Sequence, residues 1–504
     1  MSDQQKYLLG LDAGNTVIKA VLFDLNGNEV AKHALDGGSS TPQPGHVERD
    51  LGELWENAVE VIRASISKAG IPPESIVGIG CAGHGNGLYL LDKNDKPQLG
   101  IQSLDSRAAP LAQALSSGGK GPEIHGICLQ KPWPSQTPTL LAWLRENRPE
   151  AYENVGTVLL CKDFITYKLT GEKVSDISDM SGCGMLRMPD CTYDANLLAL
   201  YGLDGAIDLL PRLVQPDEVA GFVTKEVAAQ TGLAVGTPVV GGLFDVVASA
   251  LGSGAVRPGQ ASVIVGTWSI NQVLSTAPVV DEAVFLVSCF GKNRFVNMEA
   301  SATSAVNLEW YVREFVERGQ HHDDPFGFCN DLIGAIKPAP DDPFFHPFLY
   351  GSGQGAHMRA GFYGLAGWHT EGHMLRAIFE GVVFEHRRHI EQLIAAGVYF
   401  GDAVLSGGGS RSPIWPQMFA DCLGKAMTVA VCEETGALGA AIAAGVGAGE
   451  FRDIEAGVAK LTATKAVFEP DPEMRAHYDN RYRLYRDLSA AMSGFWQEVQ
   501  KTTT

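Results

Sequence analysis

The chain contains one strand–turn–strand pattern twice, and this duplication restricts the folds open to it. In the first copy, Leu8–Asp24, apolar runs rich in Leu, Val and Ile flank a polar turn at Asp12–Thr16. In the second copy, Gln260–Leu274, similar runs flank the turn Gly266–Ser269. Apolar runs on both sides of a short turn that contains glycine predict a β-hairpin. We therefore expect two lobes of similar plan, each beginning with a hairpin whose turn is polar.

The segments that follow the first hairpin extend it into a whole domain. We predict a third antiparallel strand at Glu29–Leu35, a helix at Asp50–Ala69 and a short buried strand at Ile76–Cys81. A glycine-rich turn, Gly83–Gly87, and another strand, Leu88–Asp92, come next. Three antiparallel strands that lead into helix, strand and helix are the order expected of an actin-like, ribonuclease-H-type domain.

The second half repeats this order. The predicted elements of this half are strands at Val239–Leu243, Gln260–Val265, Ser269–Leu274, Phe295–Glu299 and Ala403–Ser406, and helices at Asp245–Leu251, 304–318, 371–397 and 413–424. We therefore predict an α/β protein of two actin-like domains, with a nucleotide and substrate cleft between them. The boundary is expected near Ser253–Pro258, which gives one domain at 1–252 and a second at 253–504.

Composition excludes several classes of partner. The formal net charge is −19 over 504 residues, which argues against nucleic acid or an anionic membrane as a partner. The start of the chain, Met1–Lys6, is polar, and no apolar run is long enough to span a membrane, so a cytoplasmic location is expected. The nine cysteines are scattered without a C-x-x-C pair. We expect buried free thiols, including those of Cys81, Cys161, Cys289 and Cys422, rather than disulfides or zinc.

The first turn has the groups that hold a nucleotide's phosphates. Gly14 lets backbone N–H groups approach an anion closely, because it has no Cβ. Asn15 and Thr16 add side-chain donors, Lys19 adds a positive charge, and Asp12 is suited to hold hydrated Mg²⁺. The same residues also fit a simple tight turn with a surface lysine, and the motif alone does not separate the two interpretations.

Three further segments give the chain its resemblance to a known family. Ala360–Glu380 reads AGFYGLAGWHTEGHMLRAIFE, Leu405–Ser412 reads LSGGGSRS, and Glu434–Ala441 reads ETGALGAA. Together with the turns above, they resemble the FGGY family of carbohydrate kinases over essentially the whole chain. We interpret the first segment as scaffold, and the small residues of the third as allowing close helix packing.

The resemblance implies that 1–252 is a sugar-binding domain and 253–504 an ATP-binding domain, and it implies roles for particular residues. Asp245 occupies the family's catalytic position and is expected to take the proton from the acceptor hydroxyl, although a helix N-cap is an alternative role for it. Asp12 and Asp245 are the expected metal-binding residues, with ATP and Mg²⁺ as cofactors. The expected nucleotide-binding residues are Asp12, Gly14, Asn15, Thr16, Lys19, Gly266, Thr267, Gly408, Gly409 and Ser412.

The acceptor is expected to be a small ketose or polyol. By resemblance, it contacts His84, Gly85, Asn86, Asp105 and Trp133 in addition to Asp245. Glycerol kinases have Arg-Glu at positions 85–86 and D-xylulose kinases typically have Met-His, so Gly-Asn departs from both. L-Xylulose kinases have Gly-Lys there and erythritol kinases Gly-Asp. The pattern is closest to L-xylulose kinases, and a neutral amide at 86 favours a shift toward a polyol.

Several alternatives stay open at this point. Within the kinase class they are an erythritol, pentitol or D-xylulose kinase, and outside it an actin-like ATPase or a pseudokinase that senses sugar. A homodimer is a family-level expectation. The sequence does not indicate the exact sugar, its handedness or the hydroxyl that is phosphorylated.

Overall fold

A computed structural model describes residues 5–318, 321–355 and 357–503. Of the polar start of the chain, residues 1–4 lie outside this description. The chain forms two compact units. The first unit comprises Met1–Pro258, Leu274–Asn297 and Glu434–Ala463, and the second comprises Gly259–Val273, Met298–Glu433 and Thr464–Thr504.

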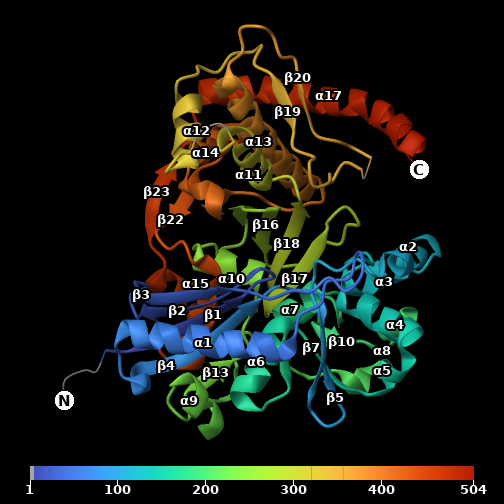
Figure 1. The fold of residues 1–504 in the computed structure, drawn as a ribbon, viewed down its shortest axis with the longest axis vertical. Coiled ribbons are helices and arrows are strands. Elements are labelled where there is room, and N and C mark those ends of the chain that lie inside the picture. Colours follow the sequence, from blue (N-terminus) through green and yellow to red (C-terminus); the bar gives the residue numbers. More distant parts are fainter. Residues whose placement is uncertain (1–4, 319–320, 356, 504) are drawn as a thin grey trace. The chain divides into compact units, whose positions relative to one another are not determined.

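The first unit is built on a mixed sheet with the strand order β12-β13-β4-β1-β2-β3, in which β14 pairs with β4 (Figure 1). The β1–β2 and β2–β3 pairs are antiparallel, and β1–β4 is parallel, as the predicted order requires. The bounds of these strands are β1 Tyr7–Ala13, β2 Val17–Asp24, β3 Glu29–Asp36, β4 Ile76–Gly83, β12 Val219–Phe222, β13 Pro238–Val240 and β14 Leu243–Phe244.

Alternation along β1 and β4 decides which helix covers which face of this sheet. Leu9, Leu11 and Ile79 point to a core shared with α1 (Leu51–Ala69), which Asp50 caps through a bond from the Glu53 N–H. On the other face, Gly10 and Gly80 lie against α15 (Thr435–Gly447). A Cβ at either glycine would approach the carbonyl oxygens of Ala437 and Ala440 to 2.0 Å. The small residues of this segment therefore allow the close packing that the sequence predicted.

The predicted strand Val239–Leu243 is broken in the structure. Gly241 and Gly242 separate β13 from β14, and Gly242 has φ +83°. A Cβ at Gly242 would lie 2.1 Å from the carbonyl oxygen of Cys81, so only glycine fits. The sequence pattern missed this break because apolar residues continue on both sides of it. The break sets Leu243–Phe244 against the end of β4 and starts α10 at Asp245.

The remaining elements of the first unit surround this sheet. A smaller sheet has the order β6-β5-β7, and the pairs β9–β10 and β8–β11 form two short ribbons. These strands are β5 Leu88–Asp92, β6 Pro97–Ile101, β7 Val155–Leu159, β8 Val174–Asp176, β9 Leu186–Arg187, β10 Thr192–Tyr193 and β11 Arg212–Val214. Strand β17, Leu286–Gly291, also lies in the first unit. The helices are α2 Ala109–Ser117, α3 Gly121–Cys128, α4 Thr137–Asn147, α5 Pro149–Glu153, α6 Cys161–Thr170, α7 Ile177–Gly182, α8 Ala195–Leu200, α9 Lys225–Thr231, α10 Asp245–Gly252 and α16 Ile454–Leu461.

The second unit repeats the arrangement of the first. Its sheet has the order β18-β16-β15-β21-β22-β23, with β15 antiparallel to β16 and parallel to β21. The predicted strands of this half are confirmed as β15 Gln260–Val265, β16 Ser269–Ser275, β18 Arg294–Ser301 and β21 Asp402–Ser406. The other elements are β19 Phe344–His346, β20 Gly361–Tyr363, β22 Met427–Ala430, β23 Thr464–Phe468, α11 Val306–Tyr311, α12 Pro325–Gly334, α13 Glu371–Ala395, α14 Trp415–Leu423 and α17 Pro472–Thr503.

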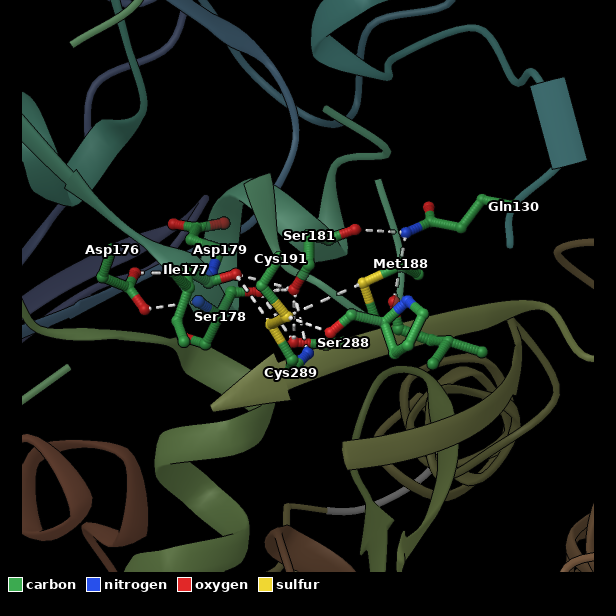
Figure 2. The surroundings of a disulfide bond; sticks show 12 residues. Gln130, Asp176, Ile177, Ser178, Asp179, Ser181, Met188, Cys191, Ser288 and Cys289 are labelled. Carbon is green, nitrogen blue, oxygen red and sulfur yellow. Dashed lines mark hydrogen bonds between the residues drawn. A yellow bond between two sulfur atoms is a disulfide. The ribbon is translucent and has the colours of Figure 1, made fainter. Parts of the chain in front are cut away.

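One expectation about the cysteines is wrong. Cys191 and Cys289 form a disulfide across 98 residues of sequence, in the first unit (Figure 2). Cys191 lies in the turn between β9 and β10, and Cys289 lies in the buried strand β17. Nothing local in the sequence links these segments, because they meet through tertiary packing. Cys81, Cys161 and Cys422 are buried and unbridged, as predicted.

No helix within the described ranges combines the length and the apolar character needed to cross a membrane.

Candidate active site

Three neighbouring strands of the first unit end side by side. Ala13, the last residue of β1, pairs with Gly83 at the end of β4, and Gly83 also pairs with Phe244 at the end of β14. All three strands run parallel, so the segments that follow them leave the sheet at one edge. In open α/β sheets, ligands bind at this carboxyl edge. The structure therefore brings the Asp12–Thr16 turn, the Gly83–Gly87 turn and Asp245 to the same edge.

Asp12 forms a charged cluster with residues from two other elements. The Nζ of Lys19 lies 3.4 Å from Asp12 Oδ2 and 2.8 Å from Glu434 Oε2, at the start of α15. Burial raises the pKa of Asp12, and Lys19 opposes part of that shift. Burial would lower the pKa of Lys19, but Asp12 and Glu434 outweigh it and raise the value. Lys19 thus bridges two carboxylates, and its contact with phosphate stays a prediction.

Asp245 is the first residue of α10 and keeps part of its surface accessible. Burial of the carboxyl group raises the pKa of Asp245 to about 8, and the negative charge of Asp12 adds to the shift. A carboxylate with a pKa near the working pH is suited to accept a proton and release it again. The electrostatic interaction with Asp12 also places the two predicted metal-binding carboxylates in one region of the first unit.

Helix α7 holds the backbone next to Asp245. The N–H of Phe244 donates a hydrogen bond of 3.0 Å to Ser178 Oγ, so the residue before Asp245 is fastened to this helix. Strand β17 holds α7 in turn, because Ser288 Oγ donates to the carbonyl of Ser178 (2.7 Å) and the Cys289 N–H donates to Ser181 Oγ (2.9 Å) (Figure 2).

A buried ionic cluster lies at the start of α7. Lys162 bridges Asp163 and Asp176, with its Nζ 2.8 Å from Asp176 Oδ1 and 3.9 Å from Asp179 Oδ2. All four side chains are at most 1% exposed. Asp176 caps α7 by accepting from the N–H groups of Ser178 and Asp179. Neither Lys162 nor Ser178 was predicted to belong to the site.

The predicted acceptor residues at the end of β4 differ in their surroundings. A Cβ at Gly85 would lie 2.4 Å from the ring of Phe244, which explains the glycine there. Asn86 has φ +65°, and its Oδ1 is buried without a hydrogen-bond partner among the described residues. His84 is buried, with Nε2 2.8 Å from the Tyr89 hydroxyl, and burial lowers its pKa to about 3. Asn86 is therefore the residue of this turn with unused hydrogen-bonding capacity.

The other two predicted acceptor residues have partners inside the first unit. Asp105 is buried and accepts from the Arg107 side chain at 2.9 Å and from the Val47 N–H at 2.6 Å. Trp133 packs edge-on against Phe285, with 5.5 Å between the ring centroids. Asp105 is thus hydrogen-bonded and Trp133 is packed against a ring inside the first unit. Contact of either residue with an acceptor stays a prediction.

The second unit has a corresponding edge. Ile264 of β15 pairs with Ser406 of β21, so the turn after β15 and the glycines after β21 start next to each other. Gly266 accepts a 2.9 Å hydrogen bond from the Ala305 N–H, which holds the turn that contains Thr267. Gly407 has φ +82° and would bring a Cβ to 2.8 Å from the carbonyl oxygen of Val265.

A pocket of about 710 Å³ opens beside these glycines within the second unit. Gly408, Gly409 and Ser412 line one side of it, and α12 contributes Phe326 and Asn330 from the other. The Ser412 hydroxyl donates to Asn330 Oδ1 at 2.7 Å, which ties the two sides together. The volume suits a nucleoside-sized ligand. The three residues predicted to bind nucleotide here thus share one pocket.

Known protein families match both halves of the chain. The N-terminal domain of the FGGY family of carbohydrate kinases matches residues 7–252, and the C-terminal domain of that family matches residues 261–448. The chain belongs to the FGGY family of carbohydrate kinases. It is therefore an enzyme of that class, as the sequence predicted.

Individual relatives of this FGGY kinase match it over nearly its whole length. The L-xylulose/3-keto-L-gulonate kinase of Escherichia coli K12 is 37% identical and covers 99% of both chains. A probable L-xylulose kinase of Pasteurella multocida is 36% identical, over 96% of this chain and 99% of its own. The solved xylulose kinase of Rhodospirillum rubrum superposes with a TM-score of 0.89 at 27% identity, covering 98% of this chain and 100% of its own. The predicted α/β fold of two actin-like domains is confirmed.

Proposed function

We propose that this kinase transfers the γ-phosphoryl group of ATP to a hydroxyl of a small ketose, with an L-xylulose-like pentulose as the favoured acceptor. Relatives named L-xylulose/3-keto-L-gulonate kinase or probable L-xylulose kinase are 36–37% identical to it over 96–99% of the chain. Gly85, where those kinases were expected to have glycine, packs against Phe244 beside the candidate base. The single observation that supports the chemistry most is the placement of Asp245, with its raised pKa, at the carboxyl edge of the sheet.

Asp245 is the general base in this proposal. The acceptor hydroxyl donates a hydrogen bond to the carboxylate and passes its proton to it as the oxygen attacks phosphorus. The bond from Phe244 to Ser178 fixes the backbone next to Asp245, which helps to keep the carboxylate in position for one hydroxyl of a bound sugar. A pKa of about 8 makes Asp245 a stronger proton acceptor than an ordinary aspartate.

Asp12 and Asp245 would hold Mg²⁺ together with the phosphates. Mg²⁺ is usually bound by one or two carboxylates and retains several waters, and two mutually repelling carboxylates in one region fit that requirement. When bound, the ion neutralises charge on the β- and γ-phosphate oxygens. The N–H groups of Asn15 and Thr16 are the donors that we assign to the phosphates, with Gly14, Lys19, Gly266 and Thr267 contributing as predicted.

The nucleoside is assigned to the pocket of the second unit. Glycines 408 and 409 leave the wall flat, and apolar side chains such as Phe326 offer a surface for a purine. We retain 1–252 as the proposed sugar-binding domain and 253–504 as the proposed ATP-binding domain. A homodimer in the cytoplasm is retained as part of the same proposal.

A release assay for ADP tests this function. The purified kinase, with ATP and Mg²⁺, is supplied separately with L-xylulose, D-xylulose, L-ribulose, 3-keto-L-gulonate, erythritol, xylitol and glycerol. We expect the largest kcat/KM with an L-ketopentose. ADP release that no sugar or polyol stimulates would refute the proposal.

Asn86 favours a second candidate, a kinase of a four- or five-carbon polyol. Its buried Oδ1 lacks a hydrogen-bond partner among the described residues and suits a donated hydroxyl. A kcat/KM for erythritol or xylitol above that for every ketose would decide for this candidate.

A further inference from the structure

The carbonyl groups of the first phosphate turn all point back into the first unit. The carbonyl of Ala13 accepts from the His84 N–H at 3.1 Å, and that of Thr16 accepts from the Gly37 N–H at 2.6 Å. Between them, the carbonyls of Gly14 and Asn15 both accept from one arginine side chain. Four successive carbonyls of the turn are therefore hydrogen-bonded to groups of the first unit.

That side chain is Arg49, which lies between the turn and α1 and is 3% exposed. Its Nη1 donates to the Gly14 carbonyl at 3.0 Å, its Nη2 to the Asn15 carbonyl at 2.5 Å, and its Nε to the Gly38 carbonyl at 3.1 Å. A second buried side chain, Gln102, donates to the Asn15 carbonyl at 2.9 Å.

Peptide planarity links these bonds to the other face of the turn. In a trans peptide the N–H points opposite to the C=O of the same unit, so carbonyls held by Arg49 turn the N–H groups of Asn15 and Thr16 away from it. Within the described part of the chain, neither of these N–H groups has a hydrogen-bond acceptor. Unused, aligned backbone donors form an anion-binding concavity.

Arg49 also differs electrically from the other buried arginine nearby. Arg107 is paired with Glu48 at 2.8 Å and Asp105 at 2.9 Å. Arg49 donates to three carbonyl oxygens and also interacts with the Tyr89 hydroxyl, but among the described residues no carboxylate lies within ion-pair distance of it. Its positive charge is thus compensated only by dipoles, directly behind the two free N–H groups. Removing a guanidinium from water without a counter-ion is costly, which indicates a function beyond packing.

We propose that Arg49 is a positioning residue for the triphosphate: it holds the Gly14–Thr16 peptides with their free N–H groups outward and supplies positive charge behind them. This inference rests on the proposed function, since it assumes that the turn binds phosphate. It assigns no contact between Arg49 and the nucleotide itself.

Binding of ATP and of adenosine to Arg49→Met tests the proposal, because adenosine has no phosphate. By calorimetry without sugar, we expect ATP to bind at least about tenfold more weakly and adenosine to change by less than about twofold. Arg63→Met is the matched control, because Arg63 also donates to a backbone carbonyl, that of Gln230, but far along the unit from the turn. It is expected to bind both ligands as the unaltered kinase does.

Every outcome decides for or against the proposal. Equal weakening of ATP and adenosine, or no weakening of either, would overturn it, because the effect would then not act through the phosphates. If Arg49→Met does not fold, Gln102→Leu, which removes the second donor to the Asn15 carbonyl, is measured in the same way, with a smaller loss of ATP affinity alone expected. An unaltered kinase that binds ATP but phosphorylates no sugar would refute the proposed function and leave this test intact.

Discussion

The two units hold the segments at the carboxyl edges of their sheets by different means. In the first, buried charges stand behind the edge: Arg49 behind one turn, and Lys162 with its carboxylates behind the helix that fastens Phe244. In the second, the corresponding turn is held by a backbone bond from Ala305, and the pocket beside it is lined by glycines, a hydroxyl and apolar side chains. The difference fits the proposal that the first unit supplies the base, while the pocket of the second unit holds the nucleoside and its Gly266–Thr267 turn contributes to phosphate binding.

The largest effect on this difference between the units is expected when Asp245 is neutralised. We expect Asp245→Asn to fold and bind ATP while kcat falls by about 10²–10⁴-fold, because the acceptor loses its proton acceptor. Steady-state kinetics with the best sugar of the panel measure the loss. A kcat within a few fold of the unaltered enzyme would remove Asp245 from the chemistry.

The buried cluster around Lys162 can be tested through the free energy of unfolding. Lys162→Met leaves Asp163 and Asp176 buried without a cation, at a cost of about 3–5 kcal/mol in the free energy of unfolding. Lys173→Met is the matched control: its pair with Asp95 is exposed, so a loss of at most about 1 kcal/mol is expected. Urea unfolding of both variants gives the two values, and equal losses would contradict the assigned support of α7.

The pH dependence of the reaction should reflect the first unit alone. Because the base acts when deprotonated and the pKa of Asp245 is about 8, kcat/KM is expected to fall roughly tenfold per pH unit below that value. The folded-state pKa also lies above that of an unfolded aspartate, so protonation stabilises the fold at low pH and this stabilisation is lost as pH rises toward about 8. The advantage of Asp245→Asn in unfolding temperature over the unaltered enzyme should therefore grow from pH 5 to pH 8.5. A flat kcat/KM profile between pH 6 and pH 8 would count against this assignment.

The smallest effect is expected in the second unit. Ser412→Ala removes the bond to Asn330 and the acceptor for the N–H groups of Ile414 and Trp415, at about 1 kcal/mol of stability and a loss of several fold in ATP affinity. The kcat at saturating ATP should stay nearly unchanged. A large fall in kcat would show that this pocket takes part in phosphoryl transfer after all.

The sequence predicted the elements that depend on local residue patterns. Both hairpins, the parallel strands β4 and β21 and the helix after Asp245 follow from apolar periodicity and turn residues, and the structure has them. The break at Gly241–Gly242 was missed because its cause, the carbonyl of Cys81, lies on another strand. Arg49, Ser178 and the Cys191–Cys289 disulfide were missed for the same reason. Their partners are distant in sequence, so only packing brings them together.

The close packing of α15 against Gly10 and Gly80 has a consequence for anyone who dissects this protein. The helix belongs to the first unit, although most strands of the second unit precede it in the chain. A fragment ending at residue 252 would lack α15, so the face of its sheet that contains Gly10 and Gly80 would lose the helix that packs on it. We expect such a truncation to aggregate on expression, and co-expression of residues 434–463 as a separate peptide to rescue part of its solubility.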